Sequence, residues 1–273
     1  MAVKVLNSCR YFHLNKLNLS CVRKLAASST SKEDEPKFSI DESKIHAKVM
    51  YDGHIPTTSF QKILLAVGSA GMALYKPQRD DMVAVMGEAT GIRALKKIHT
   101  KMTQEAEGQM ILREKPRINS QTVDLNYLKT LPKSTLGGSY IKFLDDNKVS
   151  PDTRMDVQFV DDAELAYVMQ RYREMHDLVH TLLNMPTNML GEVAVKWVEG
   201  IQTGLPMCTL GALFGPLRFA PKQRRKYLVV LPWAIRCGYQ SRFLMNIYFE
   251  KRWEQPIDVI RKEMNIEPPP SIL

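Results

Sequence analysis

Apolar residues recur every three or four positions along most of the chain after residue 57, which is the spacing of an amphipathic helix. A first helix is predicted to begin at Thr57, Thr58 or Ser59 and to stop near Pro77, and Asp80 is expected to cap a second. The pattern then continues over 92–115, which predicts one long helix. Further helices are expected over 123–132, 135–147, 189–202, 222–238, 239–253 and 257–264.

The most strongly signalled helix lies in the middle of the chain. Asp161 followed by Glu164 resembles a capping box, in which the first side chain accepts from early amides of the helix. Pro186 interrupts this helix, and Thr187 or Asn188 is expected to begin the next one. Between these signals runs an apolar stripe of Leu165, Val168, Met169, Tyr172, Met175, Val179 and Leu183.

The alternation typical of strands is nearly absent, and residues 156–160 are the one candidate. The sequence therefore predicts an all-α fold, a single helical domain with an N-terminal transit peptide. Hydrophobic residues at 44% and charged residues at 25% are ordinary for a chain that buries a core. The expected boundaries are a mitochondrial transit peptide over 1–30, a polar linker over 31–50, an all-helical metal-binding domain over 51–265 and a C-terminal tail over 266–273.

The positive charge of the chain is concentrated at its N-terminus. The net charge is +9, but residues 1–32 hold six basic residues and no acid, which leaves 32 basic against 29 acidic residues elsewhere. This distribution argues against a nucleic-acid-binding face. A basic, acid-free and serine-containing start is typical of a mitochondrial transit peptide, although a disordered basic tail has a similar composition. Beyond it only Cys208 and Cys237 remain, which fits a reducing compartment.

The longest uncharged run, 200–217, is nearly long enough to cross a bilayer. Its four glycines and two prolines disfavour a continuous helix, so any membrane contact is expected at the surface. The apolar segment 227–235, with Trp233, is expected either to rest on anionic headgroups or to form a buried core helix. A basic cluster precedes that segment and consists of Lys222, Arg224, Arg225 and Lys226.

Two of the six histidines, His176 and His180, stand four positions apart, so both project from one face of the predicted helix. This spacing lets two ring nitrogens reach one ion at about 2.0–2.1 Å. Asp177 lies on the flank of the same face, and Glu192 falls early in the returning helix, where it can face the histidines. Two histidines and one or two carboxylates form a site suited to Zn²⁺, and also to Fe²⁺ or Mn²⁺.

The same residues have other readings. Histidines at this spacing occur by chance in helices, and Glu192 could be a solvated acid that the helix dipole favours. The convergence of imidazoles and acids on an apolar face favours a metal, because burying them unpaired is costly. A zinc peptidase would carry Glu where Asp177 stands, one methylene longer. A phosphohydrolase of the HD type would need further His and Asp ligands, which the sequence does not identify.

The segment "HDLVHTLLNMPTNMLGEVAVKWVE" resembles the H-D-x-x-H-x(11)-E signature of the coenzyme Q biosynthesis protein 4 family. The resemblance covers roughly residues 50–265, and there is no departure from the signature at its four ligand positions. Other segments similar to that family are "LYKPQRDDMVAVMGEATG", "ELAYVMQRYREMHD", "IQTGLPMC" and "RRKYLVVLPWAIRCG".

The resemblance implies an all-helical peripheral membrane protein on the matrix side of the mitochondrial inner membrane. It implies that a divalent metal, usually given as zinc, binds to His176, Asp177, His180 and Glu192. The catalytic residues, including the general acid, remain unassigned. Expected partners are the other enzymes of the coenzyme Q biosynthetic complex, a polyprenylated benzoate lipid and the inner-membrane surface, with a homodimer as one option and no nucleic acid.

The implied function is ubiquinone biosynthesis by a metal-dependent lyase, a carboxy-lyase that also organises the biosynthetic complex. It would remove the C1 carboxyl of 4-hydroxy-3-methoxy-5-polyprenylbenzoate to give 2-methoxy-6-polyprenylphenol and CO₂. Zinc has no redox chemistry and implies a non-oxidative loss of CO₂, whereas a redox-active metal would permit an oxidative variant. The alternative is a non-catalytic scaffold or lipid-presenting protein with a structural metal.

Overall fold

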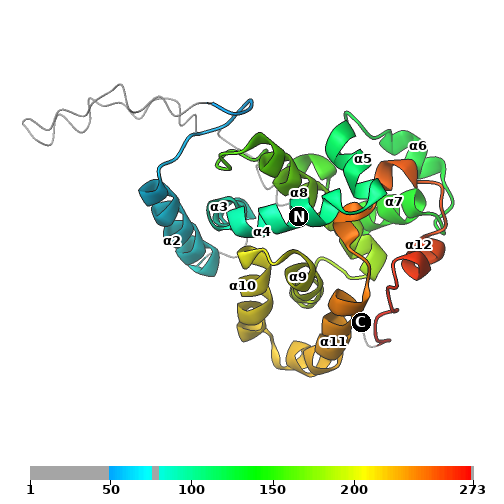
Figure 1. The fold of residues 1–273 in the computed structure, drawn as a ribbon. Helices are drawn as coiled ribbons and strands as arrows, with labels where there is room; N and C mark the ends of the chain where they lie inside the picture. Colours follow the sequence, from blue (N-terminus) through cyan, green and yellow to red (C-terminus); the bar gives the residue numbers. More distant parts are fainter. Residues whose placement is uncertain (1–48, 76–79, 272–273) are drawn as a thin grey trace, which may run out of the picture. The chain divides into compact units, whose positions relative to one another are not determined.

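The computed structural model describes residues 49–75 and 80–271, which belong to one compact unit (Figure 1). The predicted transit peptide and almost all of the predicted linker lie outside the described residues. Helices dominate this part of the chain and no strand forms in it, which confirms the all-α, single-domain prediction. Residues 156–160, the candidate strand, form an irregular segment that buries Val157 and Val160.

The helices of the described residues closely follow the apolar pattern, and four short 3-10 helices join them. The α-helices are α2 (Ser59–Tyr75), α3 (Asp80–Thr90), α4 (Ile92–Thr103), α5 (Ala106–Glu114), α6 (Leu125–Thr130), α7 (Leu136–Asn147), α8 (Ala163–Leu183), α9 (Met189–Thr203), α10 (Pro206–Phe214), α11 (Pro221–Gln240) and α12 (Ile257–Glu263). The 3-10 helices are η2 (Pro151–Thr153), η3 (Gly215–Arg218), η4 (Leu244–Asn246) and η5 (Phe249–Lys251).

Helix α8 forms the centre of the fold and packs against α4, α7 and α9 (Figure 1). Its residues are buried on every side from Leu165 to Leu183, far more than one apolar stripe predicts. Burying charged side chains in such a helix requires partners, because an unpaired charge is costly in the interior. The ion pairs that supply them include Arg171 with Glu250, Arg173 with Glu88, Glu174 with Arg117, and Asp177 with Arg154.

The cap of α8 differs from the prediction by one residue. Asp162 is the N-cap, and its side chain accepts from the Leu165 amide at 2.9 Å. The predicted cap, Asp161, instead bonds His54 at 3.0 Å and pairs with Lys62 of α2. Two consecutive aspartates can each cap a helix, and the contact with α2 decides which one does.

The predicted long helix over 92–115 is wrong, because α4 and α5 are separated by Gln104 and Glu105. Glu105 is extended, with φ −121° and ψ 142°. Gly108 then packs so closely that a Cβ there would lie 2.3 Å from the Met102 carbonyl oxygen and 2.5 Å from Oδ1 of Asn246. The apolar spacing continues across this break, so periodicity alone did not reveal it.

The helix predicted over 239–253 is also wrong. The chain leaves α11 after Gln240 and continues through η4 and η5. Gln202 of α9 binds this backbone, since its amide donates to the carbonyls of Ser241 and Arg242 and its oxygen accepts from the Leu244 amide. Apolar residues along the segment are buried almost continuously, which an amphipathic helix at a surface cannot achieve.

Candidate metal centre

The turn between α8 and α9 positions the two helices that carry the candidate ligands. Asn184 ends α8 in the left-handed conformation with φ 52°, and the Asn188 side chain caps α9 by accepting from two early amides. This confirms the predicted break at Pro186 and the second of the two predicted helix starts. A Cβ at Gly191 would lie 2.0 Å from the Pro186 carbonyl oxygen, so glycine allows the turn to close tightly.

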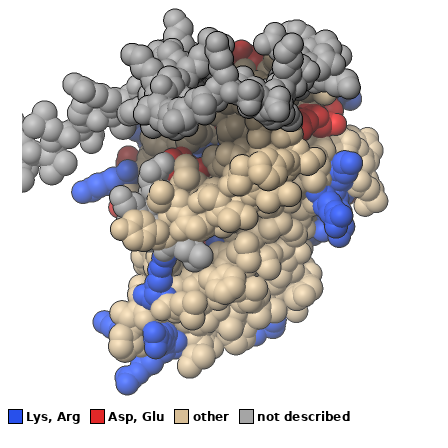
Figure 2. All heavy atoms as spheres, turned by 90° about the vertical axis from the view of Figure 1, so that its left-hand side faces the viewer, with Lys and Arg blue, Asp and Glu red and all other residues tan. Residues whose placement is uncertain are grey.

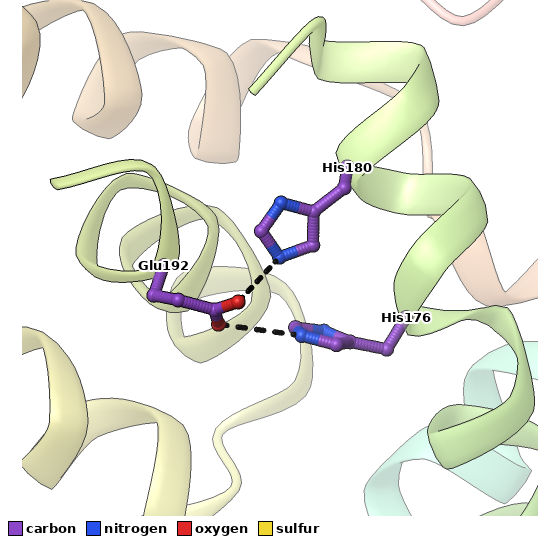
Figure 3. Close-up of side chains that lie close together, drawn as sticks. All are labelled: His176, His180 and Glu192. Carbon is purple, nitrogen blue, oxygen red and sulfur yellow. Dashed lines mark ion pairs between the residues drawn. The ribbon is translucent and has the colours of Figure 1, made fainter. Parts of the chain in front are cut away.

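Three of the four predicted ligands meet in this structure. The rings of His176 and His180 project from α8 toward the carboxylate of Glu192, which comes from the first turn of α9 (Figure 3). Nε2 of His176 lies 3.5 Å from Oε2 of Glu192, and Nε2 of His180 lies 3.3 Å from Oε1. One ligand atom from each residue lies within 4.8 Å of the other two, so the group could hold a metal ion.

Asp177, the fourth predicted ligand, lies outside this group of three. It is buried, and its Oδ1 accepts from Nη2 of Arg154 at 2.5 Å. The Asp177 carboxylate therefore neutralises a guanidinium in this structure, and its role as a metal ligand stays a prediction.

Hydrogen bonds on the far side of each ring indicate which nitrogen carries the proton. Nδ1 of His176 lies 2.6 Å from Oε1 of Glu199, and Nδ1 of His180 lies 3.1 Å from the Met185 carbonyl oxygen. A carbonyl and an ionised carboxylate only accept, so each Nδ1 carries a hydrogen and donates it. In the neutral imidazoles, both Nε2 lone pairs therefore point toward the carboxylate of Glu192.

This arrangement fits a cation. Two ring lone pairs and a carboxylate face one another, and the buried Nε2 of His180 makes no hydrogen bond. Electron-pair donors gathered in this way repel one another unless a positive charge lies between them, and two imidazoles with a carboxylate are ligands that Zn²⁺ accepts.

The pKa values of the three groups reflect their mutual contacts. Burial disfavours the charged form of Glu192, but its contacts with His176 and His180, whose rings stabilise the carboxylate when they are protonated, hold its pKa well below the usual value. Burial, the largest single effect, acts to lower the pKa of His176, but the charge of Glu199 together with the ring's contacts with Glu192 and Glu199 raises that pKa above its ordinary value. Glu192 is therefore a carboxylate and a ready ligand at neutral pH.

A second buried cluster, which the sequence did not predict, lies behind His176. Oε2 of Glu199 accepts from the Tyr172 hydroxyl at 2.6 Å and from Nζ of Lys196 at 2.8 Å. The thiol sulfur of Cys208 lies 3.1 Å from the Tyr172 hydroxyl oxygen and 3.8 Å from Oε2 of Glu199. Burial opposes these charges, but the nearby His176 and Lys196 lower the pKa of Glu199 far below its ordinary value. The available signal was helical spacing, since Glu192, Lys196 and Glu199 share one face of α9.

The fold and the group of His176, His180 and Glu192 define the class of protein. It is an all-helical protein with a candidate metal centre of two histidines and one carboxylate on adjacent helices. The model of the family "Coenzyme Q (ubiquinone) biosynthesis protein Coq4" matches residues 51–270, and the chain belongs to this family. This membership confirms the resemblance that the H-D-x-x-H-x(11)-E signature indicated.

Relatives from animals are similar over most of the chain. The mitochondrial ubiquinone biosynthesis protein COQ4 homolog of Mus musculus is 57% identical over 226 residues, which cover 82% of this chain and 85% of the relative. The Homo sapiens homolog, also named mitochondrial, is 55% identical over 223 residues, with coverages of 81% and 84%.

A solved structure shares the fold. It is a crystal structure from Nostoc punctiforme of a protein provisionally named for ubiquinone biosynthesis, and it aligns with a TM-score of 0.60. The alignment covers 76% of this chain and 97% of that one, at 17% sequence identity. At this identity the likeness shows the fold alone.

Proposed function

We propose that this chain acts in ubiquinone biosynthesis as a metal-dependent carboxy-lyase. Its substrate would be 4-hydroxy-3-methoxy-5-polyprenylbenzoate, and its products 2-methoxy-6-polyprenylphenol and CO₂. The observation that carries the proposal is the convergence of the two Nε2 atoms of His176 and His180 on the Glu192 carboxylate, with no proton donor between them in the neutral form. Family membership supports a role in ubiquinone biosynthesis, and the two imidazoles with one carboxylate support a metal-dependent reaction.

The ligands favour a divalent ion of borderline softness. His176, His180 and Glu192 would hold it and leave a coordination position for a substrate oxygen, as catalytic zinc sites with three protein ligands do. Asp177 would join them only by leaving Arg154. When bound, such an ion supplies positive charge for the carboxylate or the ring oxygens of the substrate.

The reaction requires a proton at C1 and an electron-rich ring. The oxygen para to C1 supports the dienone formed when C1 takes up a proton, and the C1–carboxyl bond then breaks, its electron pair restoring the ring as CO₂ leaves. No oxidant is consumed in this non-oxidative form. The proton donor stays unassigned, because Asp177 is bound to Arg154 and Glu192 is a carboxylate.

We also propose that the chain works on an anionic membrane surface, where its lipid substrate resides. Helix α2 presents an outward apolar stripe of Phe60, Ile63, Leu64 and Val67, each more than half exposed. Helix α10, which like α2 packs against α3, continues into the exposed Leu213, Phe214 and Leu217. We call these seven residues the apolar face, and Figure 2 shows this side of the molecule as a broad uncharged surface with lysines and arginines along its sides and lower edge and some acidic residues near its upper edge.

The charge pattern favours anionic lipid as the occupant of the apolar face. Residues 200–249, which include α10 and α11, contain seven lysines and arginines and no Asp or Glu. A second copy of the chain would bring like charges together, whereas headgroups of opposite sign would attract them. None of the helices in the described residues combines the length and hydropathy that a bilayer crossing requires.

Trp233, one expected lipid contact, is instead buried, and its indole donates to the Glu267 carbonyl at 3.0 Å. The lipid contact proposed here is the apolar face; within 227–235, Leu228 and Val229 are exposed, so a lipid contact of that segment stays a prediction. Co-sedimentation with phosphatidylcholine vesicles that contain an anionic phospholipid tests it. Phe60→Ser with Val67→Ser should release the chain, and Val259→Ser on α12, also an exposed valine, should not. Equal vesicle binding by wild type, the double variant and Val259→Ser would refute the proposal that the apolar face contacts lipid.

The reaction is tested by elemental analysis together with CO₂ release from the prenylated acid. Wild type should hold one divalent ion per chain and release CO₂, His180→Ala should do neither, and His99→Ala, a histidine outside the cluster, should resemble wild type. If wild type holds the ion and releases no CO₂, the scaffold or lipid-presenting alternative with a structural metal replaces the lyase.

A further inference from the structure

The carboxylate of Glu199 occupies a position behind His176 that the metal-ligand signature does not include. Its Oε1 lies 2.6 Å from Nδ1 of His176, the ring nitrogen that faces away from Glu192. Only 4% of Glu199 is exposed. Two further donors, Tyr172 and Lys196, fix its other oxygen, so this carboxylate has little freedom to rotate.

The charges of this cluster compensate one another. A buried carboxylate would be strongly destabilising alone, but the Lys196 ammonium lies 2.8 Å from Oε2 and neutralises it. Nζ of Lys196 also donates to the Tyr172 hydroxyl at 3.0 Å, which leaves the hydroxyl hydrogen free to point at Glu199. Glu199 therefore stays ionised, and an ionised carboxylate can only accept from the imidazole.

We infer that Glu199 is a positioning residue, which holds the His176 ring in the tautomer whose Nε2 lone pair faces Glu192 and His180. Lys196 and Tyr172 hold Glu199 in turn. The inference rests on the proposed metal centre and adds to it a residue outside the ligand set. A carboxylate that accepts from a ligating histidine orients the ring and makes the opposite nitrogen a better donor.

The two histidines differ in what supports them, and this difference makes the inference testable. His180 donates to the backbone carbonyl of Met185, which no side-chain substitution removes. His176 depends on a side chain that can be replaced. Loss of Glu199 should therefore disturb His176 and leave His180 unchanged.

The test measures zinc binding and ring tautomers in the full chain, independently of turnover. Zinc affinity is measured by competition with a chromophoric chelator, and the tautomers by ¹⁵N–¹H correlation of the histidine rings in the zinc-loaded protein. Glu199→Gln should weaken zinc binding by about 10- to 100-fold. It should also shift the His176 ring nitrogens, while those of His180 keep their wild-type positions.

Two more variants separate positioning from general destabilisation. Glu199→Asp keeps the charge and should recover part of the affinity, whereas Tyr172→Phe removes one hydrogen bond to Glu199 and should weaken zinc binding about 2- to 10-fold. Glu88→Gln neutralises a buried carboxylate that pairs with Arg173 elsewhere in the fold, so it should lower stability and leave zinc affinity unchanged. If Glu199→Gln does not fold, Tyr172→Phe carries the test.

The outcomes distinguish this inference from the proposed function. Wild-type zinc affinity with unshifted His176 nitrogens in Glu199→Gln would overturn the positioning role even if wild type releases CO₂. A wild type that binds zinc but releases no CO₂ refutes the lyase and leaves the positioning result to be judged on affinity and tautomers. A wild type that binds no zinc overturns both.

Discussion

Replacing Arg171 by methionine probes the ion pair that connects α8, the helix with two of the candidate ligands, to the C-terminal part of the chain. Arg171 is fully buried in α8, and its guanidinium pairs with both carboxylate oxygens of Glu250. The same group donates to the Ile247 carbonyl at 3.1 Å. Methionine fills the space of the aliphatic stem but supplies no donor.

The expected cost follows from what the substitution leaves behind. The side chain of Glu250 is only 15% exposed, so its carboxylate would remain largely desolvated without its cation, and the Ile247 carbonyl would lose a donor. Removing one partner of a buried pair costs about 3–5 kcal/mol. For a domain of this size the melting temperature should fall by on the order of 10 °C. Arg171→Met with Glu250→Leu should recover most of the loss, because it removes the stranded charge as well.

Urea denaturation followed by circular dichroism measures these differences, with a chelator present so that metal binding does not add to the stability. The unfolding slopes of wild type and variants should agree if only stability changes. A loss below about 1 kcal/mol in Arg171→Met, or a double variant as unstable as the single one, would contradict the reasoning about the buried pair.

Other predictions concern single groups. Asp177→Asn should lower stability by about 1–3 kcal/mol through its bond to Arg154, with zinc affinity near the wild-type value; a loss of zinc binding like that of His180→Ala would instead make Asp177 a ligand. Burial opposes ionisation of Asp161, but hydrogen bonds, chiefly from Lys62, lower its pKa. The Asp161 carboxylate therefore stabilises the folded state at pH values above its unfolded pKa, and this stabilisation is lost as the pH falls through its folded pKa. Asp161→Asn should flatten the acid side of the curve of unfolding free energy against pH, and an unchanged curve would contradict this. Burial raises the pKa of the Cys208 thiol to about 12, so peptide mass spectrometry should find it unalkylated by iodoacetamide at neutral pH and alkylated in urea; rapid native labelling would exclude burial.

Local signals in the sequence predicted most of the helices and the proximity of three candidate ligands. The i, i+4 spacing of His176 and His180 fixes one helix face, and a turn at Pro186 returns the next helix at once, so Glu192 could be placed from a few neighbouring positions. Helix spacing and helix start and stop signals are enough to predict such a contact when the interacting groups lie on consecutive helices.

Features set by distant contacts could not be predicted in this way. At the break between α4 and α5, Gly108 packs against Asn246, which lies far away in the sequence. The buried indole of Trp233 has its hydrogen-bond acceptor, the carbonyl of Glu267, in the distant C-terminal segment. Glu199 was not predicted, because its partners Tyr172 and His176 belong to a different helix.

The turn between α8 and α9 has a consequence for the order in which this protein folds. A short connection closes with little loss of chain entropy, so these two helices can meet early and on their own contacts. The guanidinium of Arg261, which bonds the last carbonyls of α8 at Thr181 and Leu182, arrives from α12 and closes a much longer loop. If the proposed site binds a divalent ion, its three candidate ligands are therefore assembled before α12 has been synthesised, and the ion would stabilise this pair of helices early in folding.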